Sequence, residues 1–327
     1  MSITSESPDY DDLPRLSPSQ LGVYDHCNMS WKFNYLDELK KKRQVQQLFF
    51  QKGNYFHQLC HFYYQGVQTG MVPGSPQILE YMTDQIKEDS KDINLENVQV
   101  MYSVIKMITR YVNAQSPRID KDVHKIIGVE RPVEYVLETE YGPIVVEGYI
   151  DLPYEDKYGI TTVRDHKTGQ KGSWANYQLY TLPQLLIYAC LLWLEGYTVR
   201  KVEINFINSY DYKKKEPTIQ EAFQLYQVQI TQEMIENFWE YIKEKATRVM
   251  YLRQNPKAIQ PTYSKDCGKC DYQPICIANL KGQPTRGLII NGYDKVDRRE
   301  FRRQSKAADA PWGNEEDSGG DSDLLGW

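Results

Sequence analysis

The sequence predicts an α/β protein in which helices flank a mixed β-sheet. Apolar residues recur at helical spacing up to residue 114 and again from residue 182, whereas strand-like segments fill the region between 124 and 168. The resulting order is a group of helices, three strands, a helix and a further strand. This order is typical of helices packed against a mixed sheet.

Four helices are predicted before the strands. The first runs from Ser17 to about Cys27, because serine is a favourable N-cap and Pro18 suits the first helical turn. The other three helices are predicted at 46–67, from Ser75 onward, and at 95–114.

Three consecutive strands are predicted next, at 124–140, 144–152 and 160–168. A hairpin centred on residue 158 places Asp151 directly opposite Asp165. Lys167 lies two residues beyond Asp165, so both side chains point to the same side of the strand. The sequence therefore predicts one patch that holds two carboxylates and a lysine.

The C-terminal half alternates again between helix and strand. A helix is predicted at 182–195, and Gly196 is a typical C-terminal stop. Two strands and a long amphipathic helix follow, at 200–210, 223–229 and 231–253.

Charge divides the chain into a basic body and acidic ends. The segments 1–12 and 304–327 carry net charges of −4 and −5, which leaves +4 for residues 13–303. We expect four parts along the chain: an acidic tail at 1–12, one domain at 13–280 with a helical insertion at about 70–120, a basic extension at 281–303, and a disordered acidic tail at 304–327.

The composition excludes several classes of protein. Hydrophobic residues make up 41% of the chain and charged residues 25%, which is typical of a globular protein rather than a disordered one. No run of 18 apolar residues occurs, and the N-terminus lacks the basic and apolar regions of a signal peptide. We therefore expect a soluble cytoplasmic protein with no membrane partner.

The patch of Asp151, Asp165 and Lys167 suits a hard divalent cation. Carboxylate oxygens are ligands that Mg²⁺ and Mn²⁺ prefer, and such a cation neutralises phosphodiester charge and acidifies water. Lys167 would orient the attacking water or stabilise the transition state. The alternative is an exposed hairpin with a cross-strand charge cluster. Because opposed carboxylates repel each other and a cation relieves that repulsion, we favour the metal site.

Four short motifs surround this patch in a fixed order. They are Gly53-x-x-x-His57, the GYIDL segment at 148–152, the VRDHKTG segment at 163–169, and Gln184-x-x-x-Tyr188. The ordered set resembles the RecB-type branch of the PD-(D/E)XK nuclease superfamily. The resemblance covers most of 53–188 and implies a restriction-endonuclease-like core, in which helices flank a mixed sheet.

The resemblance also implies roles for individual residues. The implied ligands of Mg²⁺ or Mn²⁺ are the side chains of His57, Asp151 and Asp165 and the main-chain carbonyl of His166. Lys167 is the implied catalytic lysine. Gln184 and Tyr188 lie four residues apart on one helix face and are implied to position that lysine or the DNA backbone.

Four of the six cysteines have the spacing of a metal site: Cys27, Cys267, Cys270 and Cys276. Four thiolates suit tetrahedral zinc or an iron–sulfur cluster, and the residues alone leave both open. RecB-type nucleases of the AddB kind, and those of CRISPR adaptation, combine one distant cysteine with a C-terminal C-x2-C-x5-C. The resemblance therefore implies a [4Fe–4S] cluster, with Zn²⁺ as the alternative, that staples the first helix to the C-terminal end.

These observations and the resemblance predict a metal-dependent deoxyribonuclease. We expect an exonuclease that acts on DNA, single-stranded or with single-stranded ends, in recombination, repair or phage DNA processing, in a prokaryotic or phage-infected cell. Basic runs at 40–43, 213–215 and 298–303 are candidate phosphate contacts. The alternatives are a non-catalytic DNA-binding subunit and a zinc-stabilised adaptor with the same fold.

A partner protein is expected as well. No phosphate-binding G-x-x-x-x-G-K-[ST] motif occurs, so a helicase would be a separate protein. The acidic tail ends in an apolar and aromatic segment at 324–327. This tail is a candidate for binding a helicase, a recombinase or a single-stranded-DNA-binding protein.

Overall fold

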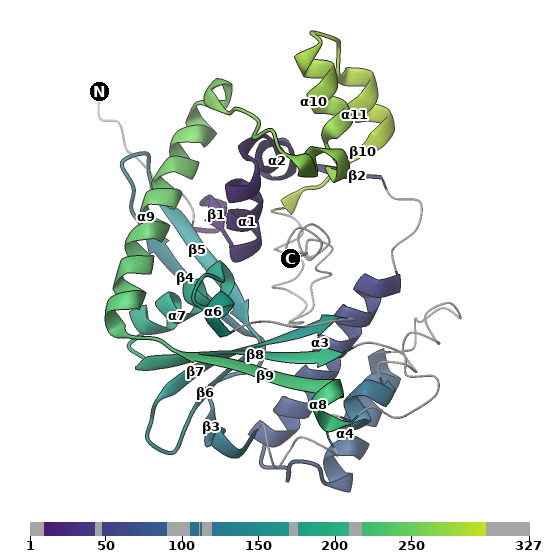
Figure 1. The fold of residues 1–327 in the computed structure, drawn as a ribbon, viewed down its shortest axis with the longest axis vertical. Helices are drawn as coiled ribbons and strands as arrows, with labels where there is room; N and C mark the ends of the chain where they lie inside the picture. The colour runs from purple at the N-terminus through teal and green to yellow at the C-terminus, as the bar shows by residue number, and fades with distance from the viewer. Residues whose placement is uncertain are drawn as a thin grey trace. The chain divides into compact units, whose positions relative to one another are not determined.

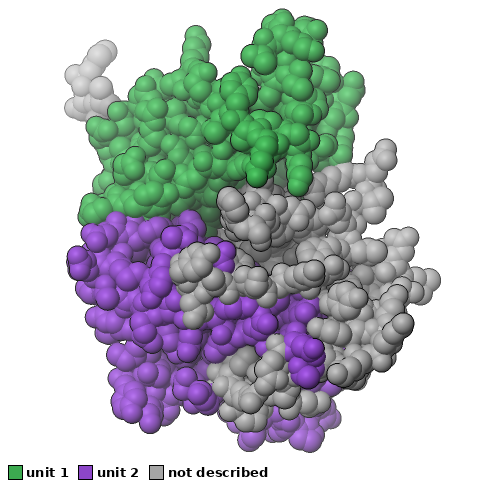
Figure 2. Space-filling view, viewed as in Figure 1, with its two compact units in different colours: residues 1–45, 134–147, 240–327 green, residues 46–133, 148–239 purple. Residues whose placement is uncertain are grey.

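The structure is a computed structural model, and it describes residues 10–42, 48–89, 105–110, 112, 120–169, 176–208 and 218–298. The chain divides into two compact units, coloured separately in Figure 2. Unit 1 comprises residues 1–45, 134–147 and 240–327, and unit 2 comprises residues 46–133 and 148–239. The predicted tail at 304–327 and the basic run at 213–215 lie outside the described residues.

Unit 2 is built on a five-stranded mixed sheet (Figure 1). Its strands, in spatial order, are β3 (Lys125–Ile126), β6 (Leu152–Glu155), β7 (Thr161–Gly169), β8 (Val199–Asn208) and β9 (Phe223–Gln229). Strands β7 and β8 are parallel, and the other neighbouring strands are antiparallel. The prediction of a mixed sheet is therefore confirmed, and helix α7 (Pro183–Leu194) lies in the connection between the two parallel strands.

Helices α3 (Leu48–Gln68) and α7 provide most of the helical packing of this unit. Helix α3 packs against α4 (Pro76–Asp89) and β7, and α7 packs against β7 and β8. Aromatic side chains of α3, including Phe56 and Tyr63, share a buried cluster with Leu152 of β6. Two short helices also belong to the described part of this unit, α6 (Asn176–Leu179) and α8 (Ile219–Ala222). Residues 105–110 of the predicted helix at 95–114 are helical, and most of the others in that range lie outside the described residues.

Unit 1 contains the N-terminal helices and the C-terminal segments. Ser17 caps α1 (Pro18–His26) as predicted, because its Oγ accepts the backbone N–H of Gln20 at 3.2 Å. A three-stranded sheet with the order β1 (Arg15–Leu16), β5 (Ile144–Ile150) and β4 (Arg131–Leu137) contributes to this unit. The boundaries between unit 1 and unit 2 fall inside β4, β5 and α9. The remaining elements are 3₁₀ turns at Tyr10–Asp12, Pro256–Ala258 and Lys265–Lys269, a π-helical turn (Lys32–Leu36), α2 (Asn28–Trp31), β2 (Leu39–Lys41), α9 (Gln232–Gln254), α10 (Gln273–Leu280), α11 (Arg286–Gly292) and β10 (Tyr293–Lys295).

Two predicted strands are interrupted in the structure. The strand predicted at 124–140 is divided into β3 and β4, because Glu130 between them has a φ of +48° that no strand tolerates. The strand predicted at 144–152 bends at Asp151, so that β5 and β6 pair with different strands. Both interruptions lie at acidic residues that face the candidate active site described below.

The C-terminal extension folds back onto the cysteine-bearing segment of unit 1. Strand β10 pairs with β2, and Tyr293 packs in a small core with Phe33, Leu39 and Tyr272. The Tyr293 hydroxyl also donates to the main-chain oxygen of Asp271 at 2.6 Å. We call this arrangement of β2, β10 and their shared core the clasp.

Several residues of the predicted basic runs form ion pairs or hydrogen bonds in or near the clasp. Lys41 pairs with Asp271 at 3.2 Å, and Lys42 lies 3.6 Å from Asp294. Arg298 Nη2 donates to Asn34 Oδ1 at 2.6 Å. These three basic residues therefore make contacts within unit 1, which reduces the charge that they can offer to a phosphate backbone.

Replacing Tyr293 by alanine is expected to lower the free energy of unfolding by about 3 kcal/mol, because a buried aromatic ring and its hydrogen bond are lost. Urea unfolding followed by circular dichroism measures this change. Lys295→Ala is the matched control, since Lys295 is exposed on the same strand and its replacement should change stability by less than about 0.5 kcal/mol. Equal free energies of unfolding for the two variants would contradict a stabilising role of Tyr293 in the clasp.

Among the described residues, no helix is both long and apolar enough to cross a membrane.

Candidate active site

The two aspartates of the predicted patch come together in unit 2. Strand β6 pairs with β7 from Leu152–Arg164 to Glu155–Thr161, which is the register that the sequence predicts. Asp151 immediately precedes β6, and Asp165 immediately follows Arg164 on β7, so continuing the register places these carboxylates opposite each other. Both side chains are buried, at 7% and 1% exposure.

Asp151 is held by main-chain and side-chain contacts. Its Oδ2 accepts the backbone N–H of His166 at 2.6 Å and lies 3.4 Å from Nδ1 of His57, which is on α3. Burial raises the pKa of Asp151 well above its usual range, and the nearby charges of Asp165 and Glu130 raise it further. Burial alone would lower the pKa of His57, but the carboxylates of Asp151 and Glu130 outweigh it and raise that pKa to about 9.

A second chain of contacts runs from Asp165 to helix α7. Lys167 Nζ lies 3.1 Å from Asp165 Oδ2 and donates to Gln184 Oε1 at 2.9 Å. Gln184 Nε2 in turn donates to the Tyr188 hydroxyl at 3.2 Å. Because Gln184 and Tyr188 are one turn apart on α7, the helix presents both to Lys167. The structure therefore brings together the predicted lysine, its aspartate and the Q-x-x-x-Y pair.

Gly148 explains how the Tyr188 ring reaches this position. A Cβ atom at residue 148 would lie 2.4 Å from Cε1 of Tyr188, so only glycine leaves room for the ring. The ring is itself 5% exposed and has little space to move. The glycine of the GYIDL segment thus determines where Tyr188, and through it Gln184, can lie.

The side chain of His166 points away from solvent. Its ring stacks on Tyr64 with centroids 5.4 Å apart, and its Nδ1 lies 2.9 Å from Nδ2 of Asn205. The amide nitrogen of Asn205 can only donate, so Nδ1 accepts. Burial lowers the pKa of His166 well below its usual range, and the neighbouring cationic groups add to this. His166 therefore contributes a neutral, anchored ring, and its main-chain carbonyl is the group that the family resemblance implies as a ligand.

A buried ionic network joins β7, the strand that carries Asp165, to the neighbouring strand β8. Arg164 Nε donates to Glu203 Oε2 at 2.9 Å, and Lys201 Nζ lies 2.8 Å from Glu203 Oε1. Burial opposes ionisation of Glu203, but the two cations outweigh it and lower its pKa. Tyr154 also donates to Glu203 at 3.0 Å. This network fixes Arg164 directly beside Asp165.

Glu130 belongs to the site, although sequence reasoning treats it only as part of a strand. Within the described residues, the group of potential metal-binding side chains whose donor atoms all lie within 4.8 Å of one another is His57, Glu130 and Asp151. Glu130 is 9% exposed. Its acidic side chain is visible in the sequence, but the left-handed backbone that interrupts the strand there has no local signal such as glycine or asparagine.

The predicted cysteine ligands all lie in unit 1. The sulfur of Cys27 accepts the backbone N–H of Thr262 at 3.4 Å, and the thiol of Cys267 approaches the main-chain oxygen of the same residue at 3.8 Å. Burial raises the pKa of Cys270, and it raises the pKa of Cys276 to about 11. The neighbouring thiols raise both pKa values further. Four soft donors on one unit fit a thiolate-bound metal, although among the described residues no three of these sulfurs form a group within 4.8 Å.

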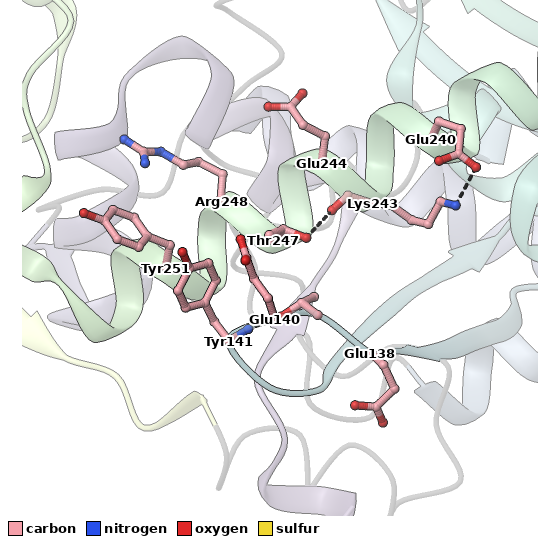
Figure 3. Close-up of a pocket in the computed structure, with 10 residues that line it drawn as sticks. Glu138, Glu140, Tyr141, Glu240, Lys243, Glu244, Thr247, Arg248 and Tyr251 are labelled. Atoms are coloured by element: carbon pink, nitrogen blue, oxygen red, sulfur yellow. Dashed lines mark hydrogen bonds and ion pairs between the residues drawn. The ribbon is translucent and has the colours of Figure 1, made fainter.

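Unit 1 also has a cavity of about 620 Å³ beside α9 (Figure 3). Tyr141 and Tyr251 line it. Four glutamates and two basic residues line it as well: Glu138, Glu140, Glu240, Glu244, Lys243 and Arg248. The excess of carboxylates disfavours a phosphate backbone. None of the predicted metal or catalytic residues lines this cavity.

The family follows from a comparison with protein-family models. A model described as the PD-(D/E)XK nuclease superfamily matches residues 15–277. The chain belongs to this superfamily. The match includes the candidate site from His57 to Tyr188, and the mixed sheet flanked by helices is consistent with the restriction-endonuclease-like core of a PD-(D/E)XK nuclease. No match is found among curated proteins.

Comparison with solved structures gives distant likenesses. A candidate exonuclease from Eubacterium rectale is 13% identical, with 86% of this chain and 98% of that chain covered and a TM-score of 0.42. The protein SSO0001 is 14% identical, with 60% and 80% covered and a TM-score of 0.30. Rai1 of Scheffersomyces stipitis, in complex with (3'-NADP)+ and calcium ion, is 10% identical, with 74% and 70% covered and a TM-score of 0.22.

Proposed function

We propose that the chain is a metal-dependent deoxyribonuclease of the RecB-type branch, and that it works as an exonuclease. The observation that carries this proposal is the arrangement of Asp151, Asp165 and Lys167 beside His57, inside the region that matches a nuclease superfamily. A non-catalytic DNA-binding subunit or a zinc-stabilised adaptor has no need of a buried carboxylate pair with its own lysine. Those two alternatives are therefore less well supported.

The residues of the site fit a divalent cation. Buried carboxylates that repel each other, beside an imidazole nitrogen, are hard and borderline donors that suit Mg²⁺ or Mn²⁺. The proposed ligands are the side chains of His57, Asp151 and Asp165 and the main-chain carbonyl of His166. The cation would neutralise phosphate charge and acidify water.

The remaining residues of the site orient the reacting groups. The Lys167 ammonium is directed by Asp165 and Gln184, so it can donate to a phosphate oxygen as negative charge develops there. Tyr188 holds Gln184 through its hydroxyl and thereby limits the positions open to the lysine. A fixed donor of this kind lowers the barrier because it needs no reorganisation during the reaction.

For the cysteines, we propose that Cys27, Cys267, Cys270 and Cys276 bind a [4Fe–4S] cluster, with Zn²⁺ as the alternative. The support is their presence on one unit and the mutual effect of the thiols on their pKa values. A metal that binds thiolates would reverse this unfavourable ionisation. Iron and acid-labile sulfide analysis of anaerobically purified protein separates the cluster from zinc.

The setting of the activity is also a proposal. We propose one nuclease domain at 13–280, with flanking tails, acting on single-stranded DNA or DNA with single-stranded ends in the cytoplasm of a prokaryotic or phage-infected cell. Recombination, repair and phage DNA processing all supply such ends. A helicase, recombinase or single-stranded-DNA-binding protein is the proposed partner of the acidic tail at 304–327.

Digestion of end-labelled single- and double-stranded DNA tests the proposed function. With Mn²⁺ we expect short products that accumulate from one end, and no products when EDTA is present. Asp165→Asn should reduce the rate by about 10³-fold, because the carboxylate is replaced by a neutral and weaker ligand. Asp122→Asn, at an exposed acid of the same unit, is the control and should retain activity. Equal cleavage by Asp165→Asn and wild type would contradict the proposal.

A further inference from the structure

We propose that Glu130 is a direct ligand of the divalent cation, as a side chain additional to His57, Asp151 and Asp165. This inference rests on the proposed function, because it concerns the same cation. Three independent features of the structure support it: the nitrogen that Glu130 faces, the backbone that holds it, and the charge of the group around it.

The first feature is the direction from which Glu130 approaches His57. Glu130 Oε1 lies 3.9 Å from His57 Nδ1, and Asp151 Oδ2 lies 3.4 Å from the same nitrogen. A carboxylate that only orients a metal-binding histidine contacts the ring nitrogen that is not coordinated. Here both carboxylates face one nitrogen, and all three donor atoms lie within 4.8 Å of one another. The three groups therefore converge on one point, where a cation would take the place of their direct contacts.

The second feature is the backbone of Glu130. Its φ of +48° is unusual for a residue with a Cβ, and among the described residues only Glu38 shares this property. Such a conformation persists only where the surroundings determine it, and it is concentrated at functional sites. The Glu130 N–H donates to the main-chain oxygen of Asp151 at 3.0 Å, which ties the strained residue to the backbone of a candidate ligand.

The third feature is the surplus of negative charge. Glu130, Asp151 and Asp165 are three buried carboxylates, and the cationic groups that act on Asp151 are His57 and Lys167. Lys167 is already engaged by Asp165 and Gln184. A carboxylate whose only role was structural would therefore add repulsion to the fold, whereas a ligand would have that repulsion relieved by the cation.

Mn²⁺ binding in the absence of DNA tests this proposal, by isothermal titration calorimetry and by the electron paramagnetic resonance signal of free Mn²⁺. We expect Glu130→Gln to raise the Kd for Mn²⁺ at least 10-fold. Glu155→Gln is the matched control, because Glu155 belongs to the same unit and pairs with exposed Lys125, and it should leave the Kd unchanged. Asp151→Asn is the positive control for the proposed metal site.

The outcomes separate this inference from the proposed function. If Asp151→Asn loses Mn²⁺ binding and Glu130→Gln keeps it, the ligand role of Glu130 is wrong and the proposed metal site stands. If neither change affects binding, the proposed metal site itself is wrong. Loss of affinity in both variants, with the control unchanged, supports both.

The thermal stability of the metal-free protein provides a second readout. Glu130→Gly removes the carboxylate and also relieves the left-handed backbone, so we expect a Tm at or above that of the wild type, together with weak Mn²⁺ binding. A structural role predicts the reverse combination, a lower Tm with an unchanged Kd for Mn²⁺, and that result would overturn the proposal.

Discussion

Lys167→Ala is expected to reduce DNA cleavage by about 10²–10³-fold, while the fold and Mn²⁺ binding persist. The ammonium group is the one side-chain cation that the described part of the site directs between Asp165 and Gln184. Its removal takes away a fixed donor to the developing phosphate charge, and a single such donor is worth about 10²–10³ in rate. Since a lysine does not bind a cation, the affinity for Mn²⁺ should not fall.

Single-turnover cleavage of end-labelled DNA measures this effect, with Mn²⁺ titration and circular dichroism on the same preparation. Lys157→Ala is the matched control, because Lys157 is exposed in the turn of the same hairpin. Equal cleavage rates for Lys167→Ala and wild type would contradict the assigned role of the lysine. Loss of activity in both variants would point instead to damage of the hairpin.

Gly148→Ala is expected to reduce cleavage by about 10–100-fold and the free energy of unfolding by about 1–3 kcal/mol. The added methyl group would lie 2.4 Å from the Tyr188 ring, so the ring or the strand must move. Because Tyr188 holds Gln184, and Gln184 holds Lys167, we expect the displacement to reach Lys167, the proposed catalytic lysine. Under the proposed function, Gly148 is thus a positioning residue.

A double variant separates the loss of packing from the loss of positioning. Gly148→Ala combined with Tyr188→Leu makes room for the methyl group, so the stability should recover in part while the activity stays low. Gly287→Ala is the control, since nothing lies within 4 Å of a Cβ there. Urea unfolding and single-turnover rates give both quantities. Full activity in Gly148→Ala would mean that the position of Tyr188 does not matter for catalysis.

The alternation of the sequence was sufficient to predict the central hairpin. Because side chains alternate along a strand and the hairpin is centred on residue 158, the pairing of Leu152 with Arg164 follows from residue numbers alone. The same holds for Gln184 and Tyr188, whose spacing matches one helical turn. Residue spacing along the chain is therefore sufficient to predict the parts of the site that lie on one hairpin and one helix.

Features that depend on distant contacts could not be predicted in this way. The bend at Asp151 arises because β5 and β6 pair with strands of different sheets. Strand β10 pairs with β2, which lies near the other end of the chain. Glu130 has a backbone conformation for which glutamate has no intrinsic preference. Its convergence with His57 requires α3 to pack on the sheet, which no local pattern specifies.

Anomalous scattering from crystals that contain Mn²⁺ tests the central claim, that a divalent cation binds at the carboxylates of unit 2. The account predicts one peak or more within about 2 Å of ligand atoms of His57, Asp151 and Asp165, and no such peak in Asp151→Asn crystals. A fully occupied Mn²⁺ elsewhere, with these carboxylates bound only to Lys167 and water, would contradict it.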